Sequence, residues 1–374
     1  MEMNKGKNKL LVFGLERNPF NDNQFDALCE EGFDLHVIYT VDQKSTENNT
    51  HWLSFPDTKY TWSYLTGFRR ILVLLKILQR PNRTIIFTGY SSVYFVVAMF
   101  VCLALNMRYL VFTDTPVIRK RVGFVKRILK RLAIWASFHV SSGVLTTGGS
   151  GREALLELGC CDKKIINFPY TPSAKQFLKT GNSESDDIFN LKSRVGNKLI
   201  IFYSSQLIYR KGLDVLICAL DVLKKRDLEF HVIVEGDGPL RSYYEDLVQG
   251  LGMSPSFDFV GFNQSSVHAR LLHLSHVVVS PSRWEPWGNI VPEAMEFGKL
   301  VVASDAVESA NDRIRHEENG LIFSSDNVGE LVGCLSLALT QVDLRKSMSE
   351  KARLTSQAWT SAVNAIFLRS FLES

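Results

Sequence analysis

A valine-rich run followed by a loop and a helix constrains this chain most strongly. Residues 276–280 have the apolar, β-branched composition of a strand buried on both faces of a parallel sheet. Two prolines and Gly288 then exclude regular structure. A helix is predicted from its N-cap at Asn289 to a stop at Gly298, and residues 300–303 form the next strand. This order is the repeating unit of a doubly wound α/β domain.

Two glutamates, Glu285 and Glu293, frame the start of that predicted helix, with seven residues between them. The N–H groups at the helix start, around Gly288, Asn289 and Ile290, are unpaired and attract phosphate. A carboxylate accepts hydrogen bonds from the paired hydroxyls of a sugar or a ribose. Glu293 also fits an ordinary acid that the helix dipole favours, and the spacing alone leaves both readings open.

Strands and helices alternate through both halves of the chain. Strands of the first half are predicted at residues 10–13, 35–39, 84–87, 109–112, 144–146 and 165–170, with helices at 24–31, 61–79 and 93–105. Strands of the second half are predicted at residues 199–203, 230–234, 257–261, 276–280 and 300–303. The alternation favours two α/β domains, each with a parallel sheet.

A polar stretch separates the two halves. Among the twelve residues 179–190, only Ile188 and Phe189 are large and apolar, which is typical of a linker. We therefore predict one domain over residues 1–178 and a second over residues 191–355.

The composition is that of an ordinary globular protein. The chain has 374 residues, 45% hydrophobic and 22% charged, and its net charge of +4 does not by itself indicate a nucleic-acid partner. Its six cysteines show no C-x-x-C or metal-ligand spacing, as expected for reduced thiols in the cytoplasm.

The apolar run at 93–105 is shorter than the roughly 20 residues that a membrane span requires, so a buried helix is predicted.

Residues 119–131 form the most strongly basic stretch. Its bases are Arg119, Lys120, Arg121, Lys126, Arg127, Lys130 and Arg131, and no acidic residue lies between Thr115 and Trp135. At helical spacing most bases fall on one face and apolar residues on the other. Two readings remain open: the solvated face of a core helix, or a patch for an anionic membrane surface or an acidic acceptor.

The motifs of the second half resemble those of one enzyme family. Glu285 and Glu293, with Gly298 after them, resemble the E-x7-E signature of retaining glycosyltransferases of family 4. The resemblance implies the α/β fold named GT-B, in which two Rossmann-like, doubly wound parallel-sheet domains face each other across a cleft. It also implies that the last helix, predicted at residues 356–374, packs back on the first domain.

The loop at residues 204–212 resembles the donor-phosphate loop of the same family. Lys211 matches the family's lysine, but Gln206 stands where the family has an arginine. The departure removes one charge-assisted contact of roughly 1.5–3 kcal/mol, and Arg210 is a candidate to replace it. The predicted donor-binding residues are Gln206, Arg210, Lys211, Gly236, Gly288, Asn289, Ile290 and Glu293.

The resemblance assigns a role to each charged residue in transfer from a UDP- or GDP-sugar. Lys211 with Arg210 would neutralise the leaving diphosphate, Glu285 would hold donor-sugar hydroxyls, and Glu293 would hold ribose hydroxyls. Because cations stabilise the leaving group, neither a metal nor another cofactor is expected. Asp114 is a candidate to orient the acceptor hydroxyl, although an aspartate before Pro116 also suits a turn.

The resemblance therefore implies a retaining, metal-independent hexosyltransferase. Its acceptor would be a glycan or a lipid-linked saccharide, in cell-surface polysaccharide synthesis, and its location the cytoplasm or the inner face of the membrane. Two alternatives remain open: a GT-B sugar-nucleotide epimerase, and a non-catalytic glycosyltransferase partner subunit, for which Gln206 is the sequence argument.

Overall fold

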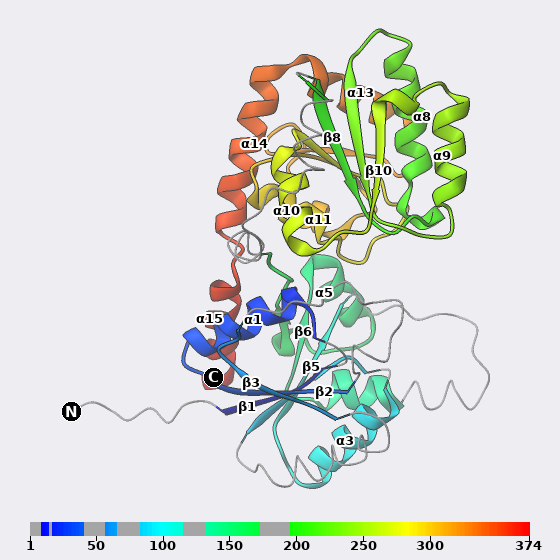
Figure 1. Cartoon of the computed structure of the whole chain (residues 1–374). Helices are drawn as coiled ribbons and strands as arrows, with labels where there is room; N and C mark the ends of the chain where they lie inside the picture. The colour runs from blue at the N-terminus through cyan, green and yellow to red at the C-terminus, as the bar shows by residue number, and fades with distance from the viewer. Residues whose placement is uncertain are drawn as a thin grey trace. The chain divides into compact units, whose positions relative to one another are not determined.

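The structure, a computed structural model, describes residues 9–14, 17–40, 57–65, 83–90, 92–114, 132–172, 195–196 and 198–374. The chain forms two compact units, each built on one sheet (Figure 1). Unit 1 comprises Met1–Tyr170 and Ser361–Ser374, and unit 2 comprises Thr171–Thr360. The predicted linker at 179–190 and all the bases of residues 119–131 lie outside the described residues.

The described part of unit 1 contains a seven-stranded parallel sheet in the order β3-β2-β1-β4-β5-β6-β7. Its strands are β1 (Lys9–Gly14), β2 (Asp34–Tyr39), β3 (Thr61–Tyr64), β4 (Thr84–Thr88), β5 (Tyr109–Thr113), β6 (Gly143–Thr146) and β7 (Ile165–Asn167). The central strands are buried at nearly every residue, which explains why they are apolar without alternation.

Helices cover both faces of this sheet. One face packs against α1 (Pro19–Glu30) and α15 (Ser361–Glu373). The other packs against α3 (Val93–Ala104), the π-helical turn η4 (Trp135–His139) and α5 (Gly148–Glu157). Successive β1 residues alternate between the two cores, Leu10 and Val12 on one side and Leu11 and Phe13 on the other.

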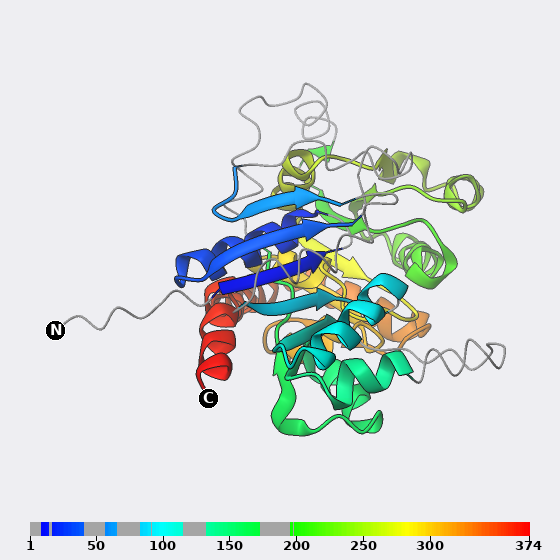
Figure 2. The same cartoon turned by 90° about the horizontal axis from the view of Figure 1, so that it is seen from below.

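The last helix belongs to unit 1. It begins later than predicted, because the preceding helix α14 (Val342–Gln357) continues past residue 356. In unit 1, α15 lies beside α1 (Figure 2), and Arg369 pairs with Glu31 at 2.8 Å. Leu368 is fully buried against the sheet, so α15 completes the hydrophobic core of this unit.

The prediction of a helix over residues 61–79 is wrong at its start. Residues Thr61–Tyr64 form the edge strand β3, which pairs in parallel with β2. Their threonine and aromatic side chains suit a half-exposed strand, and pairing with β2 satisfies the backbone on one side. Residues 66–79 lie outside the described residues.

The described part of unit 2 contains a six-stranded parallel sheet in the order β10-β9-β8-β11-β12-β13. Its strands are β8 (Leu199–Ser204), β9 (Phe230–Glu235), β10 (Phe257–Gly261), β11 (Val277–Ser280), β12 (Leu300–Ser304) and β13 (Leu321–Phe323).

This sheet is also covered on both faces. One core contains α8 (Leu213–Lys224), α9 (Arg241–Gly250) and α13 (Val328–Thr340). The other contains α10 (Ser265–Leu274), α11 (Ile290–Glu296) and α12 (Glu308–Arg313), with Ala352 of α14. The strand, loop, helix and strand predicted from residue 276 onward are therefore confirmed as β11, α11 and β12.

The apolar run at 93–105 is a helix, as predicted. Phe95, Ala98, Met99 and Cys102 of α3 are buried in the core of unit 1. Within the described residues, every helix is too short or too polar to cross a bilayer.

Candidate functional site

The strand order of unit 2 reverses between β8 and β11. From β8 the chain proceeds outward through β9 and β10, then returns to β11 on the other side of β8. Ligands of open parallel sheets bind at such a switch point, outside the carboxyl ends of the strands. The loop at 205–212 follows β8 and contains Arg210 and Lys211, whereas the loop at 281–289 follows β11 and contains Glu285.

Two glycines let these loops approach one another closely. Gly212 has a φ of +68°, and a Cβ atom there would overlap the carbonyl oxygen of Pro281. Gly236 has a φ of +121°, and a Cβ atom there would overlap the carbonyl oxygen of Ser205. Backbone meets backbone at both contacts, so only glycine fits. The predicted donor residue Gly236 therefore holds the loop after β9 against the loop after β8.

Two cations converge on one carboxylate in the switch-point loops. The Lys211 ammonium is paired with Oε2 of Glu285, and Nη1 of Arg210 lies 3.5 Å from the same oxygen. Arg210 also donates to the carbonyl oxygen of Trp284 at 2.7 Å, and its guanidinium lies 5.3 Å from the centre of the Trp284 ring. Glu285 is buried, so its charge is compensated locally. Gln206 precedes Arg210 in the same loop, and it is exposed.

Arg283 fastens the two loops together. Its guanidinium forms a bidentate pair with Asp214 of α8, at 2.9 and 2.7 Å, and lies 3.8 Å from the centre of the Tyr209 ring. The Arg283 side chain also donates to the carbonyl oxygen of Tyr209 at 2.6 Å. Hydrogen bonding to Asp214 raises the pKa of Arg283 above its ordinary value. These contacts fix the turn that carries Lys211.

The backbone around Glu285 is anchored to the loop after β12. The Glu285 N–H donates to the carbonyl oxygen of Ala306 at 2.9 Å. Asn289 precedes α11, as predicted, but its side chain forms no capping hydrogen bond. The Asn289 Oδ1 atom is buried without a hydrogen-bond partner among the described residues. Nearby, the carbonyl oxygen of Gly288 accepts from Ser309, and Ile290 begins α11.

Glu293 is bound to a histidine that the sequence analysis did not identify. His268 of α10 lies between two carboxylates, with Nε2 at 3.2 Å from Oε2 of Glu293 and Nδ1 at 2.5 Å from Oε2 of Glu235. Ser204, at the end of β8, donates to the same Glu235 oxygen at 2.7 Å. Burial opposes the charged imidazole, but the two carboxylates outweigh it and raise the pKa of His268 to about 10. The ring is therefore cationic at neutral pH.

The structure thus groups the predicted charged residues of unit 2 into two clusters at the carboxyl edge of one sheet. Lys211, Arg210 and Glu285 form the first, and Glu293 belongs to the second with Glu235 and His268. Sequence reasoning overlooked His268 and Arg283. Arg283 adjoins the Glu285 motif and was detectable by position, whereas His268 sits within a helix and gives no local signal.

The unit 1 candidate, Asp114, lies at the carboxyl end of β5. Its side chain is near Tyr170, whose pKa is raised chiefly by burial and also by the Asp114 charge. Thr113 donates to the Asp114 carbonyl oxygen at 2.9 Å. The structure therefore places Asp114 at the carboxyl edge of its own sheet, and its role toward an acceptor stays a prediction.

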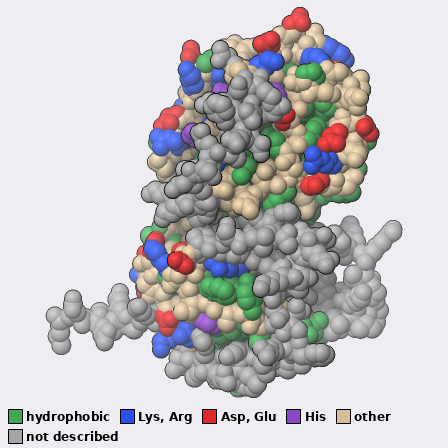
Figure 3. All heavy atoms as spheres, viewed as in Figure 1, with side chains coloured by type: hydrophobic (Ala, Val, Ile, Leu, Met, Phe, Trp, Pro, Cys, Tyr) green, Lys and Arg blue, Asp and Glu red, His purple; other side chains and the backbone are tan. Residues whose placement is uncertain are grey.

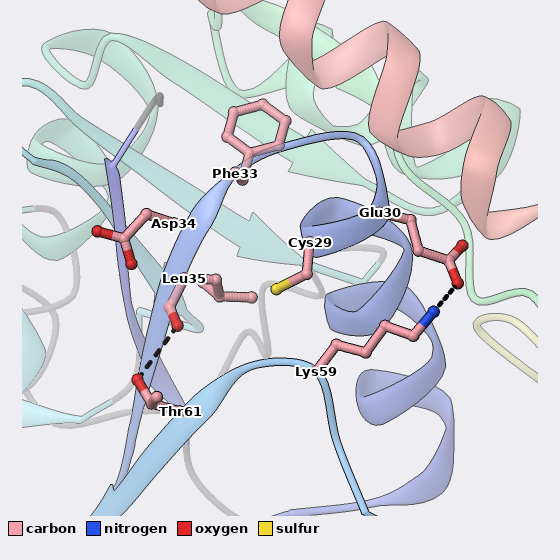
Figure 4. A pocket seen from close by; sticks show the side chains of 7 residues that line it. All are labelled: Cys29, Glu30, Phe33, Asp34, Leu35, Lys59 and Thr61. Atoms are coloured by element: carbon pink, nitrogen blue, oxygen red, sulfur yellow. Dashed lines mark hydrogen bonds and ion pairs between the residues drawn. The ribbon is translucent and has the colours of Figure 1, made fainter. Parts of the chain in front are cut away.

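A pocket in unit 1 lies at the opposite edge of the sheet (Figure 4). It is lined by Cys29, Glu30, Phe33, Asp34, Leu35, Lys59 and Thr61, at the end of α1 and the starts of β2 and β3. Lys59 and Glu30 pair with each other across it. Burial raises the pKa of the Cys29 thiol to about 11, so the thiol is protonated at neutral pH. This pocket plays no part in the sites predicted from the sequence.

Acidic and basic side chains are interspersed on the face of unit 2 that Figure 3 shows. That face therefore presents no broad field of a single sign. Across the described part of the chain, no group of three or more histidine, cysteine, aspartate or glutamate side chains is arranged to hold a metal ion. Metal independence itself stays a prediction.

Residues 184–355 match the family model described as Glycosyl transferases group 1. The match covers most of unit 2, including both switch-point loops and the His268 cluster. This match supports a glycosyltransferase group 1 domain in this part of the chain.

Curated relatives match part of the chain. An uncharacterized glycosyltransferase of Methanocaldococcus jannaschii is 29% identical over 175 residues, covering 46% of this chain and 44% of the relative. An alpha-D-kanosaminyltransferase of Streptomyces kanamyceticus is 27% identical over 232 residues, covering 61% of this chain and 59% of the relative. The chain spans about half the length of the curated relatives it matches.

Solved structures match over nearly the whole chain. Anabaena HepE in complex with UDP has a TM-score of 0.76 and 16% identity, covering 98% of this chain and 99% of HepE. Sucrose-phosphate synthase from Thermosynechococcus elongatus has a TM-score of 0.72 and 15% identity, covering 98% of both chains. At these identities the likeness establishes the fold alone. The predicted GT-B class, with two Rossmann-like parallel-sheet domains, is confirmed.

Proposed function

We propose that this chain is a glycosyltransferase that moves a sugar from a nucleotide-diphosphate sugar to a glycan or lipid-linked acceptor. The observation that carries the proposal is the convergence of Lys211 and Arg210 on Glu285, at the switch point of a glycosyltransferase group 1 domain. The structurally similar protein HepE was crystallised with UDP and with UDP-glucose, which supports a UDP-sugar as the first donor to test.

The charge cluster suits a diphosphate leaving group. A diphosphate carries more negative charge than one carboxylate, so it competes with Glu285 for both Lys211 and Arg210. Once released, the Glu285 carboxylate can accept hydrogen bonds from hydroxyls of the donor sugar. The two cations then stabilise the charge that develops on the leaving group, and we propose that the reaction needs no metal.

Retention at the anomeric carbon follows from the resemblance of Glu285 and Glu293 to the E-x7-E signature. We assign Asp114 to orientation of the acceptor hydroxyl and the overall reaction to synthesis of a cell-surface polysaccharide. NMR of the first-formed product tests the stereochemistry, because inversion at the anomeric carbon would contradict the assignment.

We also propose that the basic stretch at residues 119–131 binds an anionic membrane surface and so brings a lipid-linked acceptor to the enzyme. Each lysine or arginine near an anionic leaflet contributes about 1 kcal/mol, and added salt weakens the attraction. Replacing Lys126, Arg127, Lys130 and Arg131 by glutamate should abolish sedimentation with anionic vesicles and leave nucleotide-sugar binding unchanged. Equal sedimentation of the two proteins would show that the stretch is an ordinary solvated surface.

A screen of UDP- and GDP-sugars for thermal stabilisation, followed by a turnover assay, tests the main proposal. Lys211→Ala should lower kcat by about 100-fold or more, because the substitution removes a preorganised positive charge that stabilises the leaving group. Arg353→Ala is a matched control, since this cation pairs with Glu350 on the exposed surface of α14. If Lys211→Ala keeps the wild-type kcat, the assignment of the phosphate loop is wrong.

The same assay separates the two alternatives. Isomerised sugar formed from a nucleotide sugar without an acceptor would identify an epimerase. Donor binding without turnover on any acceptor would favour a non-catalytic partner subunit. Gln206→Arg adds a further comparison: it should tighten donor binding only where Arg210 has not taken over the contact.

A further inference from the structure

A buried histidine joins two carboxylates of unit 2, and the donor contacts proposed above do not use it. The two ring nitrogens of His268 face Glu235 at 2.5 Å and Glu293 at 3.2 Å. A neutral imidazole has a single N–H donor, whereas two carboxylate partners require two donors. With both glutamates ionised, the geometry therefore calls for the doubly protonated, cationic ring.

The cluster is built from four separate elements. Ser204 ends β8, Glu235 ends β9, His268 lies on α10 and Glu293 lies on α11. The His268 ring also lies 5.8 Å from the Phe202 ring, measured between ring centres. The His268, Glu235 and Glu293 side chains are only 15%, 5% and 7% exposed. Such burial restricts the ring to one position and, through it, the Glu293 carboxylate.

The charges of the cluster explain why a cation is needed there. Two buried carboxylates repel each other, and in low dielectric each requires a compensating partner. With His268 cationic, the sum of the three charges is −1 − 1 + 1, or −1. The cluster keeps one net negative charge and is suited to hydroxyl or amide donors rather than to phosphate.

Acceptor capacity remains on both glutamates. The ion pairs and the Ser204 hydrogen bond all use the Oε2 atoms of Glu235 and Glu293. The Oε1 atom of Glu235 is buried with no hydrogen-bond partner among the described residues. A buried carboxylate oxygen without a donor is costly, so a ligand that brings hydroxyl groups is favoured at this edge.

We propose that His268 is a positioning residue that holds the Glu293 carboxylate where it accepts hydrogen bonds from the ribose of a nucleotide sugar. The inference rests on the proposed function, because it takes the ribose contact of Glu293 from there. Glutamate has three side-chain torsions, and fixing them in advance removes an entropic cost from ligand binding. His268 is thus expected to act on ribose recognition alone, leaving phosphate binding to Lys211 and Arg210.

Calorimetry with four nucleotides tests the proposal on the full chain. UDP and GDP are each compared with their 2′-deoxy forms, so the readout is the preference for a ribose 2′-hydroxyl. Wild type should prefer the ribonucleotide by about tenfold or more, the effect of one hydrogen bond to a charged group. His268→Gln should reduce this preference to less than about threefold, as should Glu293→Gln. The double variant should lose no more than either single variant, because both act through one contact.

His273→Gln is the matched control, since His273 is an exposed histidine on the same helix α10. It should keep the wild-type preference. If His268→Gln does not fold, Glu235→Gln removes the negative charge that anchors the far side of the ring, and the preference should again fall.

Each other outcome overturns the inference. A purely structural role for His268 would weaken ribo- and deoxyribonucleotides equally and leave the preference intact. Loss of the preference in Glu293→Gln but not in His268→Gln would reject the positioning role and leave the proposed function standing. Absence of any preference in wild type would reject the ribose contact of Glu293, and the positioning role with it.

Discussion

The charged residues of unit 2 compensate one another in two separate clusters, and each cluster has its own chemical character. Lys211 and Arg210 bring two positive charges to Glu285, so the first cluster has a net charge of +1 and attracts anions. Glu235, His268 and Glu293 sum to −1, so the second cluster attracts hydrogen-bond donors. A nucleotide sugar carries both an anionic diphosphate and hydroxyl groups, and the pair of clusters therefore suits these two kinds of group.

The raised pKa of His268 predicts a pH-dependent contribution to stability. Its pKa rises from an ordinary 6.5 to about 10 in the folded protein, where the attraction of the carboxylates exceeds the opposing effect of burial. Stabilisation by the charged ring is therefore fully present below pH 6.5 and is lost as the pH rises through 10. His268→Ala should lower the free energy of unfolding by about 3 kcal/mol at pH 6, and the difference should shrink toward pH 10.

Urea unfolding of wild type and His268→Ala at several pH values measures this difference. Comparing the two proteins cancels other groups that titrate in the same range, such as Lys299, whose pKa burial lowers to about 8. A difference that stays constant from pH 6 to pH 10 would contradict the assigned charge state.

At the scale of elements, the geometry of the switch point depends on loops that are held together by Arg283. The turn η6 (Tyr209–Lys211) follows β8, and the segment at 281–289 follows β11, so the two are distant in sequence. Arg283 joins them through Asp214, the Tyr209 ring and an ion pair of 2.6 Å with Asp326. The close contact of Gly212 with Pro281 brings the two backbones together at the same place.

Arg283→Ala should therefore lower kcat/KM by about 10- to 100-fold without removing any group that contacts the donor. The expected cause is displacement of Lys211 relative to Glu285, because errors of about 1 Å in positioning are costly to catalysis. Asp214→Asn weakens the ion pair with Arg283 and leaves the other Arg283 contacts in place, so it should cause a smaller loss of kcat/KM. Steady-state kinetics measure the loss in both variants. A wild-type kcat/KM in Arg283→Ala would show that the position of Lys211 does not depend on the Arg283 contacts.

At the scale of the whole molecule, the chain leaves unit 1, forms unit 2 and returns to unit 1 with its last helix. The break between α14 and α15 falls at residues 358–360. There the centre of the Trp359 ring lies 4.9 Å from Cζ of Arg313, within unit 2. In unit 1, α15 covers the sheet beside α1 and contributes Ala365 and Leu368 to its core. The last helix therefore completes the core of the first unit.

Leu368→Ala should destabilise unit 1 by about 2–5 kcal/mol, the cost of a cavity at a fully buried leucine. Hydrogen exchange resolved by peptide should then speed up in β1, α1 and β7 of unit 1. Nucleotide binding should be retained, because the donor residues lie in unit 2. The exposed Ile366 of the same helix provides the control, and Ile366→Ala should leave exchange unchanged.

The GT-B class was predicted from the resemblance of the motifs to a known family. Local sequence determined the alternation of strands and helices and the placement of Lys211, Glu285 and Glu293 after parallel strands. These features follow from short-range periodicity and from the residues that end each strand. Tertiary structure alone decided that Thr61–Tyr64 is an edge strand and that the last helix starts at Ser361.

Tertiary structure also decided which charges pair. Glu285 meets a lysine 74 positions away, and His268 meets carboxylates 33 and 25 positions away. No local pattern encodes such partners, because they come together only when the strands and helices pack. The sequence by itself therefore determined which groups stand at the carboxyl edge of the second sheet. Folding determined which charges compensate one another there, since burial makes each charge depend on its nearest neighbours in space.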